Sequence, residues 1–556
     1  MDAETEKDIA ETEKDIREAV ALKNRGRVAG RRSITIGGML RPLANRSGVR
    51  SVAPGVHSAN EVPVTRDRSI DLGVLALAVV VGTVLRVVGL GAVGLNSDEA
   101  VYAGQAASLV GNPNFADNFP IIRAHPLLFQ VLVSPFYRTG IPEVPGRYVN
   151  AFFGVGTIVL VFQLGRLLYS RRVGALAALL LAVMPYHVII TRQVLLDGPM
   201  TFFATAALVC LAVMARTGQS RWLVATGSCL GVASLTKETA VIMIVPVFVF
   251  LSLVPRFWKP VRYLVSGAAA AMALAVAYPI VTAASGGWRS GQSYLLWQLS
   301  RRPNHDFLFY LTVVPAAMGV LLLVSAALGL ILLRRRASWR EVLLLAWIVV
   351  PFVFFEVWPV KGFPYLVLLT PAVAVLAART VVALIDLKPR TRLTVGSGVV
   401  ASAVLVLSLM VPSVRAVLEP SSSGLAGSGG SPGGREAGLW VDAHLPEGAR
   451  LMTLGPSMGN VLQYYSGRRV DGLSVSPNPL HRNPSYQPIS NPDAALRSGD
   501  YQYVVWDAYS AKRSPTFAAR ELTLIRKHGG RVVHTELAAF DHKARQLVVV
   551  IYEVQP

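Results

Sequence analysis

The stretch GRYVNAFFGVGTIVLVFQLGRLLYSRRVGALAALLLAVMPYHVIITRQVLLDGPMTFFATAAL, residues 146–208, consists of long apolar runs separated by short polar turns. A helix needs about 20 apolar residues to cross the hydrocarbon core of a bilayer, and the runs at 148–169, 173–190 and 198–215 come close to that length. Over the whole chain 53% of the residues are hydrophobic and 16% are charged, which is too apolar for an ordinary soluble domain. The sequence therefore predicts a multi-pass α-helical membrane protein.

Outward from this stretch, the same length criterion finds further apolar runs in both directions along the chain. They lie at 70–90, 222–236, 239–255, 263–284, 308–333, 341–359, 363–384 and 393–414. Together with the first set they predict about eleven transmembrane helices. We expect these helices to form one membrane domain over residues 70–415.

The net charge of +21 is spread in small clusters between the apolar runs. A single basic patch would suggest nucleic acid, whereas this distribution indicates membrane topology and no nucleic-acid partner. Cytoplasmic loops carry an excess of Lys and Arg, and alternate loops, around residues 170, 218, 258, 336 and 390, are basic. The pattern predicts a protein of the cell membrane with its N-terminus in the cytoplasm and its C-terminus outside.

Three further segments lie outside the predicted membrane domain, one before it and two after it. Residues 1–69 are polar, with a basic second half, and predict a disordered cytoplasmic tail. Residues 416–435 are rich in Gly and Ser, which is typical of a flexible linker. In residues 436–556 strand-like runs such as YQYVVW alternate with helix-like runs, which predicts an extracytoplasmic α/β domain with an accessory or acceptor-positioning role.

An acidic pair, Asp98 and Glu99, follows the first predicted span in GLNSDEAVYAGQAASLV. The segment after the pair has helical character, and Asn96 or Ser97 could cap it. The helix macrodipole favours carboxylates at this position by about 0.3 to 1 kcal/mol, so capping alone would explain the pair. Catalysis is the alternative, because the charge pattern places both carboxylates on the outward face.

Other ionisable residues recur on the same predicted face, beside otherwise apolar spans. They are Arg123, His125, Arg147, Arg192, Asp197, Lys237, Glu238, Glu356 and Lys361, with Tyr365 close to the last. Each could anchor a helix end, but charges at the bilayer centre cost about 2.5 to 3.5 kcal/mol each, so the set indicates a water-filled cavity. Such a cavity suits a polyprenyl-phosphate sugar: cations neutralise the phosphate, the tail lies among helices and membrane lipids, and a carboxylate acts as base.

These motifs resemble the GT-C membrane glycosyltransferases over roughly residues 70–415, in particular the branch that holds the protein O-mannosyltransferases and the lipid A aminoarabinose transferase. The resemblance lies in the pair of SDEAVYAGQA, in His125 of AHPLLF, in the stretch 146–208 that opens with Gly146 and Arg147, and in Lys237 of SLTKETAVIMIVP. It implies an inverting transfer of a sugar, most commonly mannose, from a polyprenyl-phosphate carrier to an extracytoplasmic acceptor.

The resemblance also implies roles for single residues. Asp98 would be the general base, with Glu99 as its catalytic partner. The donor phosphate would be contacted by Arg147, Lys237, His125 and Lys361. The chain has His-Pro-Leu where the mannosyltransferases commonly have His-Pro-Pro, and its C-terminal part lacks their β-trefoil repeats, so the acceptor stays open between protein, lipid and glycan.

The sequence assigns no certain cofactor. A divalent cation such as Mg²⁺ or Mn²⁺ stays open because some relatives bind one, and Asp98, Glu99 and Asp197 could supply oxygen ligands. The alternative to an enzyme is a transporter or flippase of lipid-linked sugars. Transporters often have paired halves with spans interrupted at matching positions, a symmetry that this sequence does not show.

Overall fold

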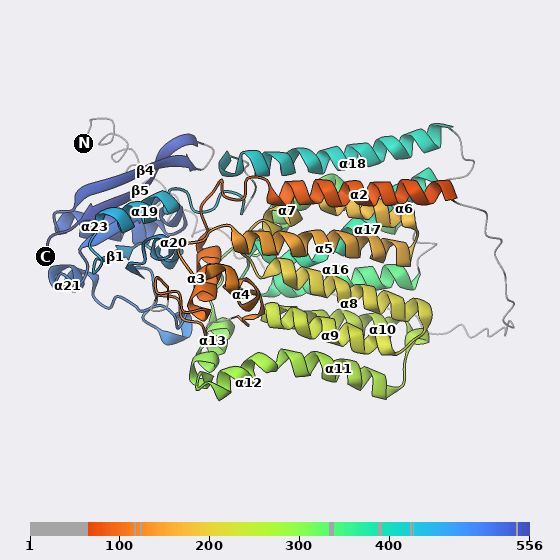
Figure 1. Cartoon of the computed structure of the whole chain (residues 1–556), viewed down its shortest axis with the longest axis horizontal. Helices are drawn as coiled ribbons and strands as arrows, with labels where there is room; N and C mark the ends of the chain where they lie inside the picture. The colour runs from red at the N-terminus through yellow and green to blue at the C-terminus, as the bar shows by residue number, and fades with distance from the viewer. Residues whose placement is uncertain are drawn as a thin grey trace, which may run out of the picture.

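The structure is a computed structural model, and it describes residues 65–115, 118–122, 125–332, 338–386, 392–422, 425, 427–540 and 543–556. The first 64 residues of the predicted tail lie outside the described part, and so does Arg123. Figure 1 shows a bundle of roughly aligned helices with a sheet and its helices packed at one end.

The bundle consists of helices that coincide with the predicted apolar runs, because in lipid a helix satisfies its own backbone hydrogen bonds. They are α2 (Thr65–Val87), α5 (Pro145–Leu168), α6 (Arg171–Ala182), α7 (Pro185–Thr191), α8 (Asp197–Thr217), α9 (Arg221–Thr236), η3 (Glu238–Met243), α10 (Ile244–Leu253), α11 (Val261–Ala275), α12 (Ala277–Ala284), α14 (Phe309–Met318), α15 (Val320–Leu332), α16 (Trp339–Val357), η6 (Phe363–Leu369), α17 (Thr370–Ile385) and α18 (Arg392–Leu418).

Within the described residues, six helices are long and apolar enough to cross a membrane, or up to eight if each of two bent pairs counts as one span. The chain bends by 60° between α6 and α7, where Pro185 cannot continue the helix, and by 98° between α14 and α15 at Gly319, whose φ is +96°. Helices α9 and α10 are shorter, and α16 has charges at both ends. A multi-pass membrane protein is thus confirmed, whereas the expected count of eleven spans is not.

The C-terminal residues 434–556 contain, over their described part, a five-stranded sheet of order β2-β1-β3-β5-β4. Its strands are β1 (Arg450–Thr453), β2 (Arg469–Gly472), β3 (Tyr503–Asp507), β4 (Arg531–Phe540) and β5 (Lys543–Glu553). Strands β1, β2 and β3 are parallel, and β5 runs antiparallel to β3 and β4. The main helices are α19 (Gly434–His444), α20 (Pro456–Ser466), α21 (Pro492–Arg497), α22 (Ala508–Arg513) and α23 (Pro515–Lys527).

Short helices lie between the bundle and this C-terminal region (Figure 1). They are α3 (Ser97–Leu109), α4 (Leu128–Val133) and α13 (Trp288–Ser300). We call this end of the bundle the α3 end. The charge pattern predicts that it faces outward.

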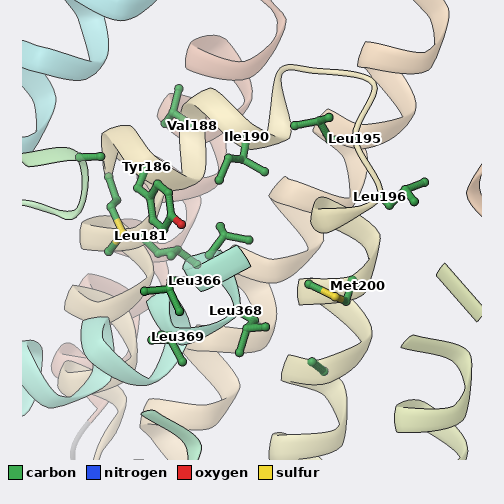
Figure 2. Close-up of a cluster of buried hydrophobic side chains, with 14 of the residues drawn as sticks. Leu181, Tyr186, Val188, Ile190, Leu195, Leu196, Met200, Leu366, Leu368 and Leu369 are labelled. Atoms are coloured by element: carbon green, nitrogen blue, oxygen red, sulfur yellow. The ribbon is translucent and has the colours of Figure 1, made fainter. Parts of the chain in front are cut away.

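An apolar cluster underlies the α3 end and joins α7, the turn before α8, the first turn of α8 and η6. Figure 2 shows it, with Leu181, Tyr186, Val188, Ile190, Leu195, Leu196, Met200, Leu366, Leu368 and Leu369 labelled. These side chains are almost completely buried. Because Asp197 directly follows Leu196 and Tyr365 directly precedes Leu366, the cluster holds two predicted site residues in place.

Candidate active site

The first turn of α3 gives its two adjacent carboxylates different surroundings. The Asn96 side-chain oxygen accepts hydrogen bonds from the backbone N–H groups of Asp98 and Glu99, both at 3.0 Å. The Glu99 carboxylate accepts from the Asn96 backbone N–H at 3.0 Å, which completes a capping box. Glu99 is 1% exposed, whereas Asp98 is exposed and its carboxylate has no hydrogen bond with any residue that the structure describes.

Glu99 is held by Arg147 of α5 in a two-pronged ion pair. The guanidinium Nε donates to one carboxylate oxygen at 2.7 Å and Nη2 donates to the other at 2.8 Å. The remaining guanidinium N–H groups donate to the carbonyl oxygens of Leu90, Val93 and Gly94. All five N–H donors of Arg147 are therefore used within the fold, and the pair joins α3, α5 and the loop that precedes α3.

A second buried ion pair links Lys237, at the end of α9, to Asp197, the first residue of α8. The Lys237 ammonium donates to both Asp197 oxygens, at 2.8 and 2.9 Å. The two side chains are 5% and 2% exposed. The ammonium also lies 4.5 Å from the centre of the Tyr365 ring, where it makes a cation–π contact.

His125 and Glu238 form a third, less buried pair close by. Their Nδ1 and Oε2 atoms are 2.7 Å apart, and the side chains are 21% and 39% exposed. The His125 ring stands edge-on to the ring of Tyr102, with 5.9 Å between the ring centres.

Tyr102, which the sequence prediction missed, connects these groups. Burial, and then the nearby carboxylates of Asp98 and Asp197, raise the pKa of its hydroxyl well above its usual value. Tyr102 follows Asp98 by four residues, so both lie on one side of α3, and this helical spacing is the signal that could have revealed it. We call the group Asp98, Tyr102, His125, Asp197, Lys237, Glu238 and Tyr365 the Tyr102 cluster.

The remaining predicted residues bond to other parts of the fold. The Lys361 ammonium donates to the carbonyl oxygens of Phe355 and Glu356, at the end of α16, and is 3.8 Å from the Glu356 carboxylate. Arg192 donates to the carbonyl oxygens of Leu85 and Gly89 and closes the end of α2. Both cations therefore bond to backbone carbonyl oxygens near helix ends.

The carboxylates predicted as metal ligands do not form one donor set. Both Asp197 oxygens bond to Lys237, and both Glu99 oxygens bond to Arg147. Across the described part of the chain, no group of three or more His, Cys, Asp or Glu side chains could hold a metal ion. As placed in the structure, Asp98, Glu99 and Asp197 do not together supply the donor set of a divalent-cation site.

Comparisons of sequence find relatives among mannosyltransferases. The sequence model of a family described as dolichyl-phosphate-mannose-protein mannosyltransferase matches residues 124–282. A stretch of 135 residues is 28% identical to YkcB of Bacillus subtilis strain 168, a protein assigned as a mannosyltransferase by inference. That match spans 24% of this chain and 19% of YkcB, so the two proteins are alike over only part of their lengths.

Comparisons of structure cover nearly the whole chain. ArnT from Cupriavidus metallidurans, in the apo state, matches with a TM-score of 0.62 and 17% identity over 88% of this chain and 98% of ArnT. ArnT bound to undecaprenyl phosphate matches with a TM-score of 0.61 and the same identity and coverage. The oligosaccharyltransferase AglB from Archaeoglobus fulgidus, in complex with an inhibitory peptide and a dolichol-phosphate, matches with a TM-score of 0.56 and 15% identity over 87% of this chain and 75% of AglB. These likenesses show a shared fold.

Proposed function

We propose that this chain is a membrane glycosyltransferase of the GT-C superfamily and that it transfers a sugar from a polyprenyl-phosphate carrier to an acceptor outside the cytoplasm. The observation that carries the proposal is the Tyr102 cluster. In it Asp98, an exposed carboxylate with no hydrogen bond to any described residue, lies near Tyr102 together with Asp197, the carboxylate that holds the buried cation Lys237. The undecaprenyl phosphate bound to ArnT and the dolichol-phosphate bound to AglB support the carrier class. The matched mannosyltransferase family supports mannose as the sugar.

In the proposed reaction Asp98 accepts the proton of the acceptor hydroxyl as that oxygen attacks the anomeric carbon. The bond between the anomeric carbon and the phosphate oxygen breaks, and its electron pair leaves with the polyprenyl phosphate. One displacement inverts the anomeric centre. Lys237 and His125 stabilise the charge that develops on the phosphate, while Asp197 and Glu238 hold these two side chains.

Arg147 and Glu99 receive a different role from the one that the sequence predicts. Because every N–H donor of Arg147 already has a partner, a phosphate could bind there only by displacing a carboxylate or a carbonyl. We therefore assign the pair to positioning α3. Lys361, whose ammonium bonds to the end of α16, is left out of the donor site. No step of the proposed reaction passes through a metal ion, and the charge pattern supports a reaction on the outer side of the membrane.

The test uses the full chain, purified and reconstituted in liposomes with a radiolabelled mannosyl polyprenyl phosphate and an extract of cell-envelope material. Release of free polyprenyl phosphate reports transfer to any acceptor. We expect Asp98→Asn to lower this release by about 10²- to 10⁴-fold, because a general base contributes that much, while donor binding persists.

The matched control is Asp386→Asn, an isosteric change at the opposite end of the bundle, where Asp386 makes an exposed ion pair with Arg172. This variant should turn over donor like the wild type. Full turnover by Asp98→Asn would exclude Asp98 as the base. Movement of intact donor across the bilayer without release would favour the transporter alternative.

A further inference from the structure

A polar junction connects the C-terminal region to the first turn of α3. Asn460 of α20 donates one side-chain N–H to the Ser97 hydroxyl at 3.0 Å and the other to the Tyr486 hydroxyl at 2.9 Å. Asn460 is 7% exposed, so both bonds are shielded from water. Ser97 begins α3 and immediately precedes Asp98.

The same helix docks on the chain that leads to Asp98. The Tyr465 hydroxyl accepts a hydrogen bond from the Leu95 backbone N–H at 2.9 Å, and Gln463 donates to the Asn118 carbonyl oxygen at 2.5 Å. Figure 1 shows α20 beside α3. Tyr465 and Gln463 bond to backbone groups, whereas Asn460 bonds to the side chain of Ser97, the residue before Asp98.

The segment that carries Tyr486 also reaches α13. Ser485 shares a hydrogen bond with the Tyr294 hydroxyl, and His481 Nδ1 lies 2.9 Å from the Ser300 carbonyl oxygen. Asn460 thus lies where α3, α20 and the segment on α13 meet. The C-terminal region therefore closes one side of the first turn of α3.

The position of the Asp98 carboxylate depends on the backbone of this turn, because no described residue bonds to the carboxylate itself. Asn96 and Glu99 hold the turn from within the membrane domain. Asn460 holds it from the C-terminal region through Ser97. A general base must lie about 2.6 to 3.2 Å from the oxygen that it deprotonates, so small shifts of this turn matter for catalysis.

We infer that Asn460 is a positioning residue for the acceptor side of the reaction, and that the acceptor hydroxyl reacts between α3 and the C-terminal region. The inference rests on the proposed function of Asp98. By holding Ser97, Asn460 directs the neighbouring carboxylate toward the acceptor, whereas Lys237 and His125 serve the donor phosphate. The C-terminal region therefore completes the active site.

The first experiment compares Asn460→Ala with Gln463→Ala in the full chain, with mannosyl polyprenyl phosphate as donor and the envelope extract as acceptor. Both variants remove an amide that docks α20, but only Asn460 bonds to the neighbour of Asp98. Asn460→Ala should lower kcat by about 10- to 100-fold, as expected for a misplacement of about 1 Å, and leave donor KM unchanged. Gln463→Ala should retain kcat. Equal losses in the two variants would reduce Asn460 to a docking contact and overturn the inference.

The second experiment uses Asn460→Asp, which keeps the shape of the side chain. The Ser97 and Tyr486 hydroxyls can each donate to the new carboxylate, so the junction remains. A second negative charge beside Asp98 disfavours its ionised form, so the acid limb of the kcat profile should move to higher pH. The other ionisable members of the Tyr102 cluster are the same in both proteins, so they do not contribute to the shift.

The result that overturns the inference differs from the result that overturns the proposed function. If the wild type releases polyprenyl phosphate but Asn460→Ala keeps its kcat, or Asn460→Asp keeps its acid limb, the positioning role is wrong and the enzyme remains. If the wild type releases no polyprenyl phosphate, the proposed function fails and the inference falls with it.

Discussion

Two buried ion pairs lie at the α3 end, Glu99 with Arg147 and Asp197 with Lys237. They differ in how many N–H donors of the cation already have a hydrogen-bond partner. Their N–O distances are 2.7 and 2.8 Å, and the four side chains are at most 5% exposed. In the first pair all five cationic N–H donors have partners within the fold. In the second, two ammonium N–H groups bond to Asp197, and the nearby Tyr365 ring offers only a cation–π contact.

Burial and pairing therefore do not by themselves separate a structural ion pair from one that serves catalysis. The number of donors already used separates them, because a phosphate oxygen can replace a weak cation–π contact more readily than a charged or carbonyl acceptor. On this ground we propose that Arg147 serves the fold and that Lys237 contacts the donor. Removing each cation should consequently have different effects.

The largest expected effect is the loss of stability in Arg147→Met. This change leaves Glu99 buried without its cation, which costs about 3 to 5 kcal/mol and should lower the melting temperature of the purified chain in detergent. The double variant Glu99→Gln with Arg147→Met removes the unpaired charge and should recover part of the loss. A single variant that melts like the wild type would contradict the structural role.

Next in size is the loss of turnover in Lys237→Met. Removing one group that stabilises transition-state charge lowers the rate by about 10²- to 10³-fold, so polyprenyl phosphate release should fall by that factor. The double variant Asp197→Asn with Lys237→Met should recover melting temperature but not turnover. Recovery of both melting temperature and turnover would mean that the Asp197–Lys237 pair has only a structural role, like the Glu99–Arg147 pair.

A smaller effect is expected from two buried acids in the C-terminal region. No described cation forms an ion pair with either of them. Asp507 and Glu521 are both 0% exposed. Burial raises the pKa of Asp507 from 3.8 to about 6, and raises that of Glu521 well above its usual value. The folded state then holds protons that the unfolded state releases, so stability is full at low pH and falls as pH rises through these pKa values.

For Asp507 alone the loss between pH 4 and pH 8 is about 2 to 3 kcal/mol. Hydrogen exchange of β3 and α22 in the full chain measures it as faster opening at the higher pH. The double substitution Asp507→Asn with Glu521→Gln should remove the dependence, because both side chains are then neutral at every pH. Persistence of the dependence would assign it to other groups.

The smallest expected effect concerns the cap of α3. Asn96→Ala removes the acceptor of two backbone N–H groups and should cost about 1 kcal/mol, seen as a small decrease in melting temperature. Asn96→Asp retains an accepting oxygen and should melt close to the wild type. A loss as large as that of Arg147→Met would mean that the cap, rather than the ion pair, holds α3.

Much of the helical framework could be predicted from the sequence. The runs expected at 148–169 and 198–215 correspond to α5 and α8, and the cap at Asn96 starts α3 at Ser97. These features are local: apolar length is dictated by the bilayer, and a cap depends on residues within one turn. The number of spans was less predictable, because bends such as the one at Gly319 divide an apolar run without changing its composition.

The identity of the acidic pair and the charge pattern around it were determined by the sequence alone, but their separation into roles was decided by the tertiary structure. Asp98 and Glu99 are neighbours in the chain, yet Glu99 meets Arg147, 48 residues away, and Ser97 beside Asp98 meets Asn460, 363 residues away. Adjacent residues on a helix point about 100° apart, so each meets whatever the packing brings to its side. Which helix or domain lies there depends on long-range packing, which no local pattern encodes.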